Sequence, residues 1–195
     1  MPIAKMARYK EFHHLLRDRL SEEKVSHSIF VAEYAASLAE GIGVDHDAAV
    51  TAGMLHDLCR TESNEDLLRR ARGYGLTLSE VALEVPLLLH GPVAAEECRR
   101  TLDIPSDSVY EAIYWHTTGR PDLDRLGQLL FLADFSEPTR RFPEAAQARA
   151  LIRNEGFDVA LHFVAEKKLA FQQSKAVVDP NLQAFQWWLQ KAYPQ

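Results

Sequence analysis

Residues 52–60 read AGMLHDLCR, an apolar stretch that runs directly into the adjacent pair His56-Asp57. Helical spacing puts Ala52 and His56 on one face of a helix that we predict over residues 48–58. A polar side chain at the end of an apolar face needs a partner, because burying it unpaired costs roughly 1–3 kcal/mol or more. The imidazole and the carboxylate point about 100° apart around the helix axis, so both could reach one metal ion. The pair alone is weak evidence, and the prediction depends on what lies on either side of it.

Four more polar residues stand where helical periodicity demands an apolar side chain. Together with the pair they would bring nitrogen and oxygen donors from five helices to one place. The predicted metal ligands are His27, His56, Asp57, His90, His116 and Asp134. This donor set exceeds the needs of one ion, so the pattern predicts a two-metal hydrolase.

The hypothesis distributes these ligands over two ions. The first ion takes His27, His56, Asp57 and Asp134, which leaves two octahedral positions for water or substrate. The second ion takes His90 and His116, and the Asp57 carboxylate bridges the two ions.

The alternative for any single histidine is an ordinary hydrogen-bonded core residue. We expect that outcome for His13, His14, His46 and His162, which have no ligand-like neighbours in the pattern. The same alternative for all six predicted ligands would leave two aspartate charges buried without a metal, which is costly.

The periodicity is helical almost throughout, and no segment alternates at period two, so the predicted fold class is all-α. Asp45, Ser63 and Ser106 are expected to cap helices. Gly73 and Gly75 are expected to break the chain. Pro92 either starts a helix or lies within a kinked one. Helices are predicted over residues 4–20, 21–40, 48–58, around 67–68, 106–116, from 121 to 134, 144–154, 157–175 and 181–192. The chain is expected to be one compact domain over residues 1–195, with a core at about 21–175 and terminal helices 4–20 and 181–192 packed on it.

Charge and composition exclude several classes of function. The 195 residues carry a net charge of −6, which argues against broad binding to nucleic acids or anionic membranes. No apolar stretch of about 18 residues and no signal-like segment occurs, so we expect a cytoplasmic protein. Cys59 and Cys98 form no CxxC pair and suit a reducing cytosol.

The order of the six predicted ligands resembles that of the HD-domain metal phosphohydrolases. It is closest to the YqeK-type branch, the symmetrical bis(5′-nucleosyl)-tetraphosphatases, and HTTGRP and LADFSEPTRRFP are the most specific stretches. The segments that carry the resemblance are HSIFVAEYAASLA (27–39), AGMLHDLCR (52–60), LLHGPVAAEE (88–97), YWHTTGRPDL (114–123) and FLADFSEPTRRFP (131–143). The resemblance implies a single HD-domain helical bundle that binds a dinucleoside polyphosphate and cleaves diadenosine tetraphosphate symmetrically to two ADP. This chain has Lys24 and Arg60 where family members often carry the other basic residue.

Mixed imidazole and carboxylate ligands suit first-row transition metals. We therefore expect two divalent or mixed-valence ions as cofactors, iron first and manganese as the alternative. Two ions roughly 3.5–4 Å apart would share a water and lower its pKa, so that a bridging hydroxide attacks phosphorus. Asp57, as the bridging ligand, belongs to the predicted catalytic residues.

Phosphoryl transfer also needs positive charge beside the transferred group. Arg120 and Arg140 are predicted to supply it as catalytic residues, since each follows a ligand-bearing segment. The predicted substrate-binding residues are Lys24, Arg60, Gly91, Thr117, Thr118, Gly119, Arg120, Arg140 and Arg141.

Two rival functions stay open. One is another HD-type phosphohydrolase, a nucleotidase or a phosphodiesterase, and the other is a nucleotide-sensing HD module without turnover. A homodimer is compatible with the sequence, and Trp187-Trp188 is expected to serve as a core or oligomer contact.

Overall fold

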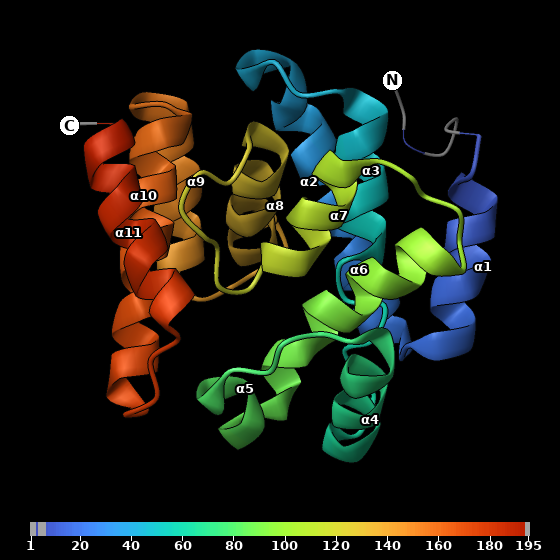
Figure 1. The fold of residues 1–195 in the computed structure, drawn as a ribbon. Helices are drawn as coiled ribbons and strands as arrows, with labels where there is room; N and C mark the ends of the chain where they lie inside the picture. Colours follow the sequence, from blue (N-terminus) through green and yellow to red (C-terminus); the bar gives the residue numbers. More distant parts are fainter. Residues whose placement is uncertain (1–2, 4–6, 194–195) are drawn as a thin grey trace.

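The chain folds into helices throughout the range that the structure, a computed structural model, describes, which is residue 3 and residues 7–193 (Figure 1). Over that range it has eleven α-helices, short 3-10 turns and no β-strand, so the predicted fold class is confirmed. The elements are α1 (Tyr9–Arg19), α2 (Glu22–Ala39), η2 (Glu40–Ile42), α3 (His46–Leu55), α4 (Asn64–Tyr74), α5 (Glu80–Glu84), η3 (Pro86–Leu89), α6 (His90–Arg100), α7 (Asp107–Trp115), α8 (Arg125–Ser136), α9 (Pro143–Asn154), α10 (Phe157–Ser174) and α11 (Pro180–Ala192).

Three helices begin at the predicted capping residues. The side chains of Asp45, Ser63 and Ser106 each accept a hydrogen bond from the backbone amide three residues later, at 2.8, 3.1 and 3.3 Å. These bonds satisfy amide groups that the first turn of a helix leaves unpaired. Pro92 is the third residue of α6, where its missing amide hydrogen removes no helical bond.

Several predicted boundaries are wrong. The helix predicted over residues 48–58 ends at Leu55, because turn-type bonds such as Leu58 N to Leu55 O replace the helical ladder. The helix predicted from residue 121 begins at Arg125, after the cap Asp124. Residues 121–124 instead form a turn. The helix predicted over residues 4–20 begins at Tyr9, and its residues 4–6 lie outside the described residues.

The polar segment around α4 is interrupted by only one of its two glycines. Gly73 lies inside α4, whereas Gly75 has φ +78° and ends the helix with a left-handed residue. α5 was not predicted, because its five residues are too few for a periodic pattern to be read.

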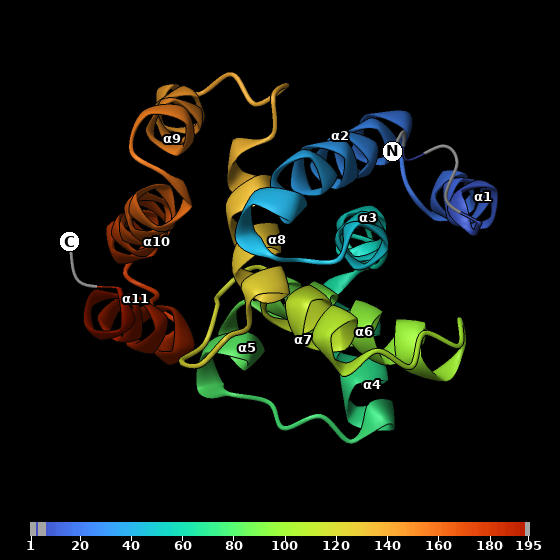
Figure 2. The same cartoon turned by 90° about the horizontal axis from the view of Figure 1, so that it is seen from above.

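α8 lies at the centre of the molecule, with α2, α3, α6 and α7 on one side and α9, α10 and α11 on the other (Figure 2). Its residues from Leu126 to Ala133 are all buried and so occupy every face of the helix, as expected for a helix with protein on all sides. Leu129 and Leu130 belong to a hydrophobic cluster shared with α1–α7, and Phe131 and Leu132 belong to a second cluster shared with α9–α11. The molecule therefore has two apolar cores that meet at α8.

The tryptophan pair on α11 divides between core and surface. Trp188 stacks on Phe185 with ring centroids 6.0 Å apart and donates a hydrogen bond to Asp122. Trp187 is 56% exposed. Among the described residues, no helix is both long and apolar enough to cross a membrane.

Candidate metal centre

Three buried histidines are oriented by the same backbone contact. In His56, His90 and His116 the Nδ1 atom lies 2.8, 2.5 and 2.8 Å from the carbonyl oxygen three residues earlier in the chain. A carbonyl oxygen only accepts, so each Nδ1 donates and each neutral ring keeps its lone pair on Nε2. All three Nε2 lone pairs therefore lie on the side of the ring away from the backbone carbonyl.

The turn after α3 brings Asp57 to these rings. Its Oδ1 lies 3.2 Å from His90 Nε2, 3.8 Å from His56 Nε2 and 3.9 Å from His116 Nε2. The Nε2 atoms of His90 and His116 are 3.0 Å apart, although each carries a lone pair. Two nitrogen ligands at right angles on one first-row metal ion, each bound at about 2.1 Å, lie about this far apart. The close approach of the two lone pairs fits a cation between them.

Asp134, near the end of α8, forms the second half of the site. Its Oδ1 lies 3.2 Å from His27 Nε2 on α2 and 3.7 Å from His56 Nε2. The Nε2 atom of His56 is buried and has no hydrogen-bond partner among the described residues. It belongs to two groups whose donor atoms lie within 4.8 Å of one another: one with His27 and Asp134, the other with Asp57 and His116. The residues present thus fit one or two metal ions, and the unpartnered His56 nitrogen is the observation that a purely structural network leaves unexplained.

Protonation at the site favours metal binding. Burial lowers the pKa of His56 and of His116, which keeps both rings neutral. Burial alone would raise the pKa of Asp57 and Asp134, but their cationic and imidazole neighbours hold both pKa values well below the ordinary range. Neutral imidazole and ionised carboxylate are the forms that bind metal ions.

Two residues that the sequence interpretation did not single out complete the site. Glu137 is buried, and its Oε1 lies 3.3 Å from His27 Nδ1, where it fixes the orientation of that ring. Lys168 on α10 donates a hydrogen bond to the backbone oxygen of His116 at 3.0 Å, and its Nζ lies 3.7 Å from Asp134 Oδ2.

Lys168, like the predicted histidine ligands, is a polar residue at a position where helical periodicity calls for an apolar side chain. It lies four residues after the buried Val164 and three after the buried Ala165, on the apolar stripe of α10. Its side chain is only 15% exposed, and its ammonium group sits 4.0 Å from the centre of the Phe131 ring. A lysine at such a position is a candidate functional residue for the same reason as a histidine there.

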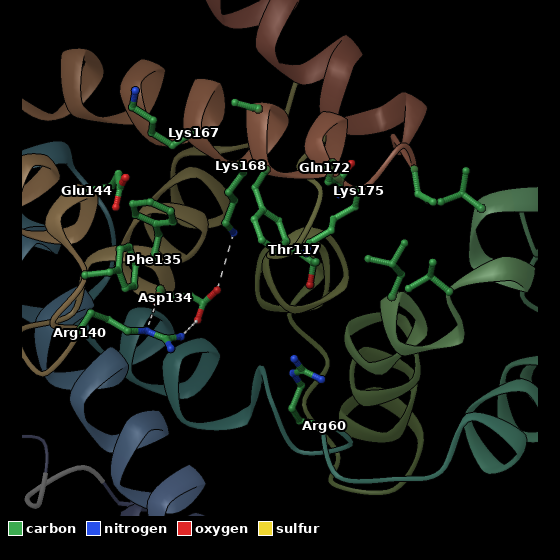
Figure 3. Close-up of a pocket in the computed structure, with 17 residues that line it drawn as sticks. Arg60, Thr117, Asp134, Phe135, Arg140, Glu144, Lys167, Lys168, Gln172 and Lys175 are labelled. Atoms are coloured by element: carbon green, nitrogen blue, oxygen red, sulfur yellow. Dashed lines mark hydrogen bonds and ion pairs between the residues drawn. The ribbon is translucent and has the colours of Figure 1, made fainter.

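The metal centre opens into a pocket of about 970 Å³, which is large for a small-molecule site (Figure 3). Arg60, Thr117, Arg140 and Lys168 surround Asp134 in its middle. The charged and polar residues that line the pocket are Arg60, Thr117, Asp134, Arg140, Glu144, Lys167, Lys168, Gln172 and Lys175. With five cations against two carboxylates, the lining favours an anionic ligand.

Four predicted substrate-binding residues lie at the metal centre. Arg140 donates to Asp134 Oδ1 at 3.1 Å. Thr117 Oγ1 lies 3.1 Å from His116 Nε2. Lys24 and Arg60 reach Asp57 at 3.4 and 3.9 Å. The three cations and the Thr117 hydroxyl therefore lie beside the predicted metal ligands.

Four others lie elsewhere. Arg120 does not line the pocket, and its Nε donates to Glu111 at 2.8 Å. Arg141 is exposed and does not line the pocket, and Thr118 is buried outside it. Gly119, at φ +65°, packs so closely that an added Cβ would lie 2.2 Å from the Phe185 ring. Arg120 thus contacts α7 and Gly119 packs on α11.

Gly91, the ninth residue predicted to bind substrate, packs closely against α7. It lies in the first turn of α6, against His116. An added Cβ would meet Ile113 O at 2.9 Å and His116 Cε1 at 3.1 Å. The glycine makes room for a predicted ligand and for the carbonyl that orients it.

Comparison with known proteins shows which family this chain belongs to. The HD domain family model matches residues 25–138. A Staphylococcus aureus protein named symmetrical bis(5′-nucleosyl)-tetraphosphatase is 32% identical over 170 residues, which cover 86% of each chain. A protein of the same name from Halalkalibacterium halodurans is 32% identical over 141 residues, covering 72% of this chain and 75% of the relative.

A solved structure has the same fold. It is described as the crystal structure of a predicted HD superfamily hydrolase involved in NAD metabolism from Clostridium acetobutylicum, and its TM-score is 0.90 at 26% identity. The superposition covers 96% of this chain and 99% of that one. All six predicted metal ligands fall inside the family match at residues 25–138, whereas Lys168 falls outside it.

Proposed function

Because the chain belongs to the HD-domain family, in the branch of the symmetrical bis(5′-nucleosyl)-tetraphosphatases, we propose that it hydrolyses diadenosine tetraphosphate to two ADP. One observation carries the proposal beyond resemblance: His56 Nε2 is buried and has no hydrogen-bond partner among the described residues, and it lies near two carboxylates, one of which, Asp134, lines a cationic pocket. Such a site suits metal-assisted attack on a polyphosphate.

The proposed ligands are the six predicted from the sequence. One ion would be held by His27, His56, Asp57 and Asp134, and a second by His90 and His116 with Asp57 between them. The mixed nitrogen and oxygen donors favour iron, with manganese as the alternative. When bound, such ions lower the pKa of water into the neutral range and neutralise phosphate charge.

The side chains around the ligands would hold the polyphosphate in line for attack. Arg140 and Lys168 flank Asp134 from opposite sides, with Nη2 3.1 Å and Nζ 3.7 Å from its two oxygens. Arg60 and Lys24 flank Asp57 in the same way. These cations would therefore neutralise the negative charge on the phosphate oxygens that are not attacked, from both halves of the site. The leaving group would depart as a nucleoside diphosphate. Arg120 would contribute only if its ion pair with Glu111 opened.

The test is a product analysis with enzyme loaded separately with iron and with manganese. We expect diadenosine tetraphosphate to give ADP alone, resolved by anion-exchange chromatography, with one ¹⁸O from labelled water in half of the ADP. ATP plus AMP would show asymmetric cleavage, and release of inorganic phosphate from AMP would favour the nucleotidase alternative. Binding without turnover of any nucleotide would favour the sensing module and contradict the proposal.

A further inference from the structure

The pocket ends in two chemically unlike walls. One wall comes from the end of α8 and the start of α9, where Phe142 and Glu144 line it beside Phe135. The other comes from α5, η3 and the chain between them, where Val85 and Leu88 line it. α9 and α5 lie apart in both overall views (Figures 1 and 2). In the close-up, Phe135 and Glu144 lie on one side of Asp134, and Thr117 and Lys175 on the other (Figure 3).

The aromatic wall has the features that hold a nucleobase. The Phe142 ring is 36% exposed, and the Phe135 ring contacts it edge to face with centroids 5.1 Å apart at 80°. Phe142 is therefore braced yet still offers surface for stacking. Glu144 is half-buried and has no hydrogen bond or ion pair among the described residues. Its carboxylate is free to accept N–H groups from the edge of a base.

The second wall could contact a nucleobase but has few groups that would distinguish one base from another. Val85 and Leu88 are half-buried, and Phe171 on α10 is 64% exposed at the rim. The nearby amide oxygen of Gln172 already accepts a hydrogen bond from Asp179 N at 2.8 Å. Apolar surface of this kind would bury any base but would distinguish poorly between bases, since it presents no free acceptor.

We propose that the two nucleosides of one substrate occupy unlike subsites in this pocket, a base-reading subsite at Phe142 and Glu144 and a base-tolerant subsite at Val85 and Leu88. This inference rests on the proposed function, because it assigns the polyphosphate to the cationic middle of the pocket. A substrate with two identical ends is then recognised unequally, and the base in the first subsite decides specificity. A substrate with one adenosine has one productive orientation and still fills the reading subsite.

The first test compares three substrates with adenosine at both ends, at one end and at neither: Ap4A, Ap4U and Up4U. We expect kcat/KM for Ap4U to lie within about threefold of that for Ap4A, and kcat/KM for Up4U to be lower by about tenfold or more, as loss of one stacked purine implies. If Ap4U fell to the level of Up4U, both ends would read the base. If all three were equal, neither end would. Either result overturns the proposal.

Variants assign the two subsites. Phe142→Ala should lower kcat/KM for Ap4A about tenfold and remove its advantage over Up4U. Leu88→Ala should lower kcat/KM for all three substrates by a similar factor and keep their order. Phe30→Ala is the matched control, since Phe30 is also 36% exposed but lies on α2, outside the pocket. A Phe142→Ala variant that behaved like Phe30→Ala would contradict the assignment.

Direct binding separates this inference from the proposed function. Calorimetry with ADP and UDP should show that the wild-type protein prefers ADP about tenfold and that Phe142→Ala loses this preference while Phe30→Ala keeps it. If the metal-loaded wild type cleaved none of the three substrates but kept this binding pattern, the proposed function would fail and the base-reading subsite would stand. If the ratio of ADP affinity to UDP affinity were the same in Phe142→Ala and Phe30→Ala, the base-reading subsite at Phe142 would be contradicted.

Discussion

At the scale of single residues, the orientation of His116 depends on a glycine. The ring is held by its Nδ1 bond to Ile113 O at 2.8 Å, and Gly91 packs against both the ring and that carbonyl. The site has no space for even one methyl group at this position. The sequence showed a glycine beside His90, but only the fold shows that it faces His116.

Gly91→Ala is therefore expected to damage the metal site more than the fold. The new Cβ would lie 2.9 Å from Ile113 O and 3.1 Å from His116 Nδ1, so the carbonyl that orients the ring and the ring itself must both shift. We expect metal affinity to fall about 10–100-fold, as for loss of a contact that orients a ligand. Titration calorimetry of the metal-free protein with Mn²⁺ measures the change.

Gly73→Ala is the matched control for this experiment. Gly73 also lies within a helix, but a Cβ there would have nothing within 4 Å. It should leave metal affinity unchanged and stabilise the protein by about 0.5–1 kcal/mol. Equal metal affinity in both alanine variants would show that Gly91 does not support His116.

At the scale of elements, α10 joins the metal centre to the C-terminal layer. It contributes a cation beside Asp134 from outside the range matched by the HD family. The neighbouring Lys167 also lines the pocket, but its ammonium group lies 5.1 Å from the centre of the Phe163 ring and points away from Asp134 in Figure 3. The two lysines carry the same charge on the same helix, but only the Lys168 ammonium group points toward Asp134. Replacing each in turn therefore tests whether a cation at that position is needed.

Lys168→Met should lower kcat/KM by about 100- to 1,000-fold, because an ammonium group aimed at transition-state charge would be lost. Metal content by elemental analysis should stay at the wild-type level. Lys167→Met should change kcat/KM less than about threefold. Loss of metal in Lys168→Met would show that the lysine holds Asp134 rather than substrate, and unchanged kinetics would exclude it from the site.

α4 supports the turn that carries the HD pair. Its residue Arg70 donates hydrogen bonds to Glu97 Oε2 at 2.6 Å, to the Tyr74 hydroxyl at 2.9 Å and to Glu62. Cys59, two residues beyond Asp57, packs against the same guanidinium group at 3.5 Å. Burial raises the pKa of the Cys59 thiol, so this cysteine is a packing residue and not a nucleophile.

Arg70→Met is expected to destabilise the protein by about 3–5 kcal/mol, since the buried Glu97 carboxylate would lose a principal partner. Burial raises the pKa of Glu97, but Arg70 and Arg19 outweigh it and hold the pKa below its ordinary value of 4.5. A depressed folded-state pKa contributes stability above pH 4.5 that is lost as the pH falls through the folded pKa. The difference between wild type and Arg70→Met should therefore be largest at pH 7 and shrink near pH 4.

Urea unfolding at pH 7 and pH 4 measures this difference. Arg69→Met is the control, because its partner Asp66 is exposed and solvent screens the pair, so this variant should unfold at nearly the wild-type urea concentration at both pH values. A difference that grew on acidification would contradict the role assigned to Glu97.

Local signals were sufficient to predict most elements and the polar residues that the fold brings together around His56. Asp45, Ser63 and Ser106 were predictable because a cap acts within one turn, and the polar residues on apolar stripes were predictable because burial requires partners. The start of α8 was not, since the left-handed Asp122 and its bond to Trp188 depend on contacts with α11. For the same reason, sequence proximity to His116 placed Arg120 and Gly119 at the site, whereas the fold turns them to Glu111 and Phe185.

At the scale of the whole molecule, the six predicted ligands come from α2, the turn after α3, α6, the end of α7, and α8. Ions bound to them would add coordinate bonds to the packing contacts and side-chain hydrogen bonds that already join these five segments of the chain. Metal bound to the folded state alone adds about 2.7 kcal/mol at a free concentration one hundred times the dissociation constant. The proposed metal ions would therefore stabilise the folded protein as well as take part in the reaction.

Removal of metal with a chelator should lower the Tm by about 5–10 °C for a chain of this length. Differential scanning calorimetry before and after re-addition of iron or manganese measures the shift. His56→Ala, which removes the ring shared by both donor groups, should melt at the same temperature with and without chelator and lose roughly three orders of magnitude in turnover. If the chelator lowered the Tm of this variant as much as that of the wild type, the metal ions would be bound at another site.

The two apolar cores that meet at α8 have an evolutionary consequence. Every predicted metal ligand belongs to α2–α8, whereas the wall at Phe142 and Glu144 belongs to the chain that packs into the second core. Substitutions at Phe142 and Glu144 could thus redirect the enzyme to new nucleotides while the six predicted metal ligands are inherited unchanged. Lineages of such proteins would diverge first in what they accept, and last in how they cut it.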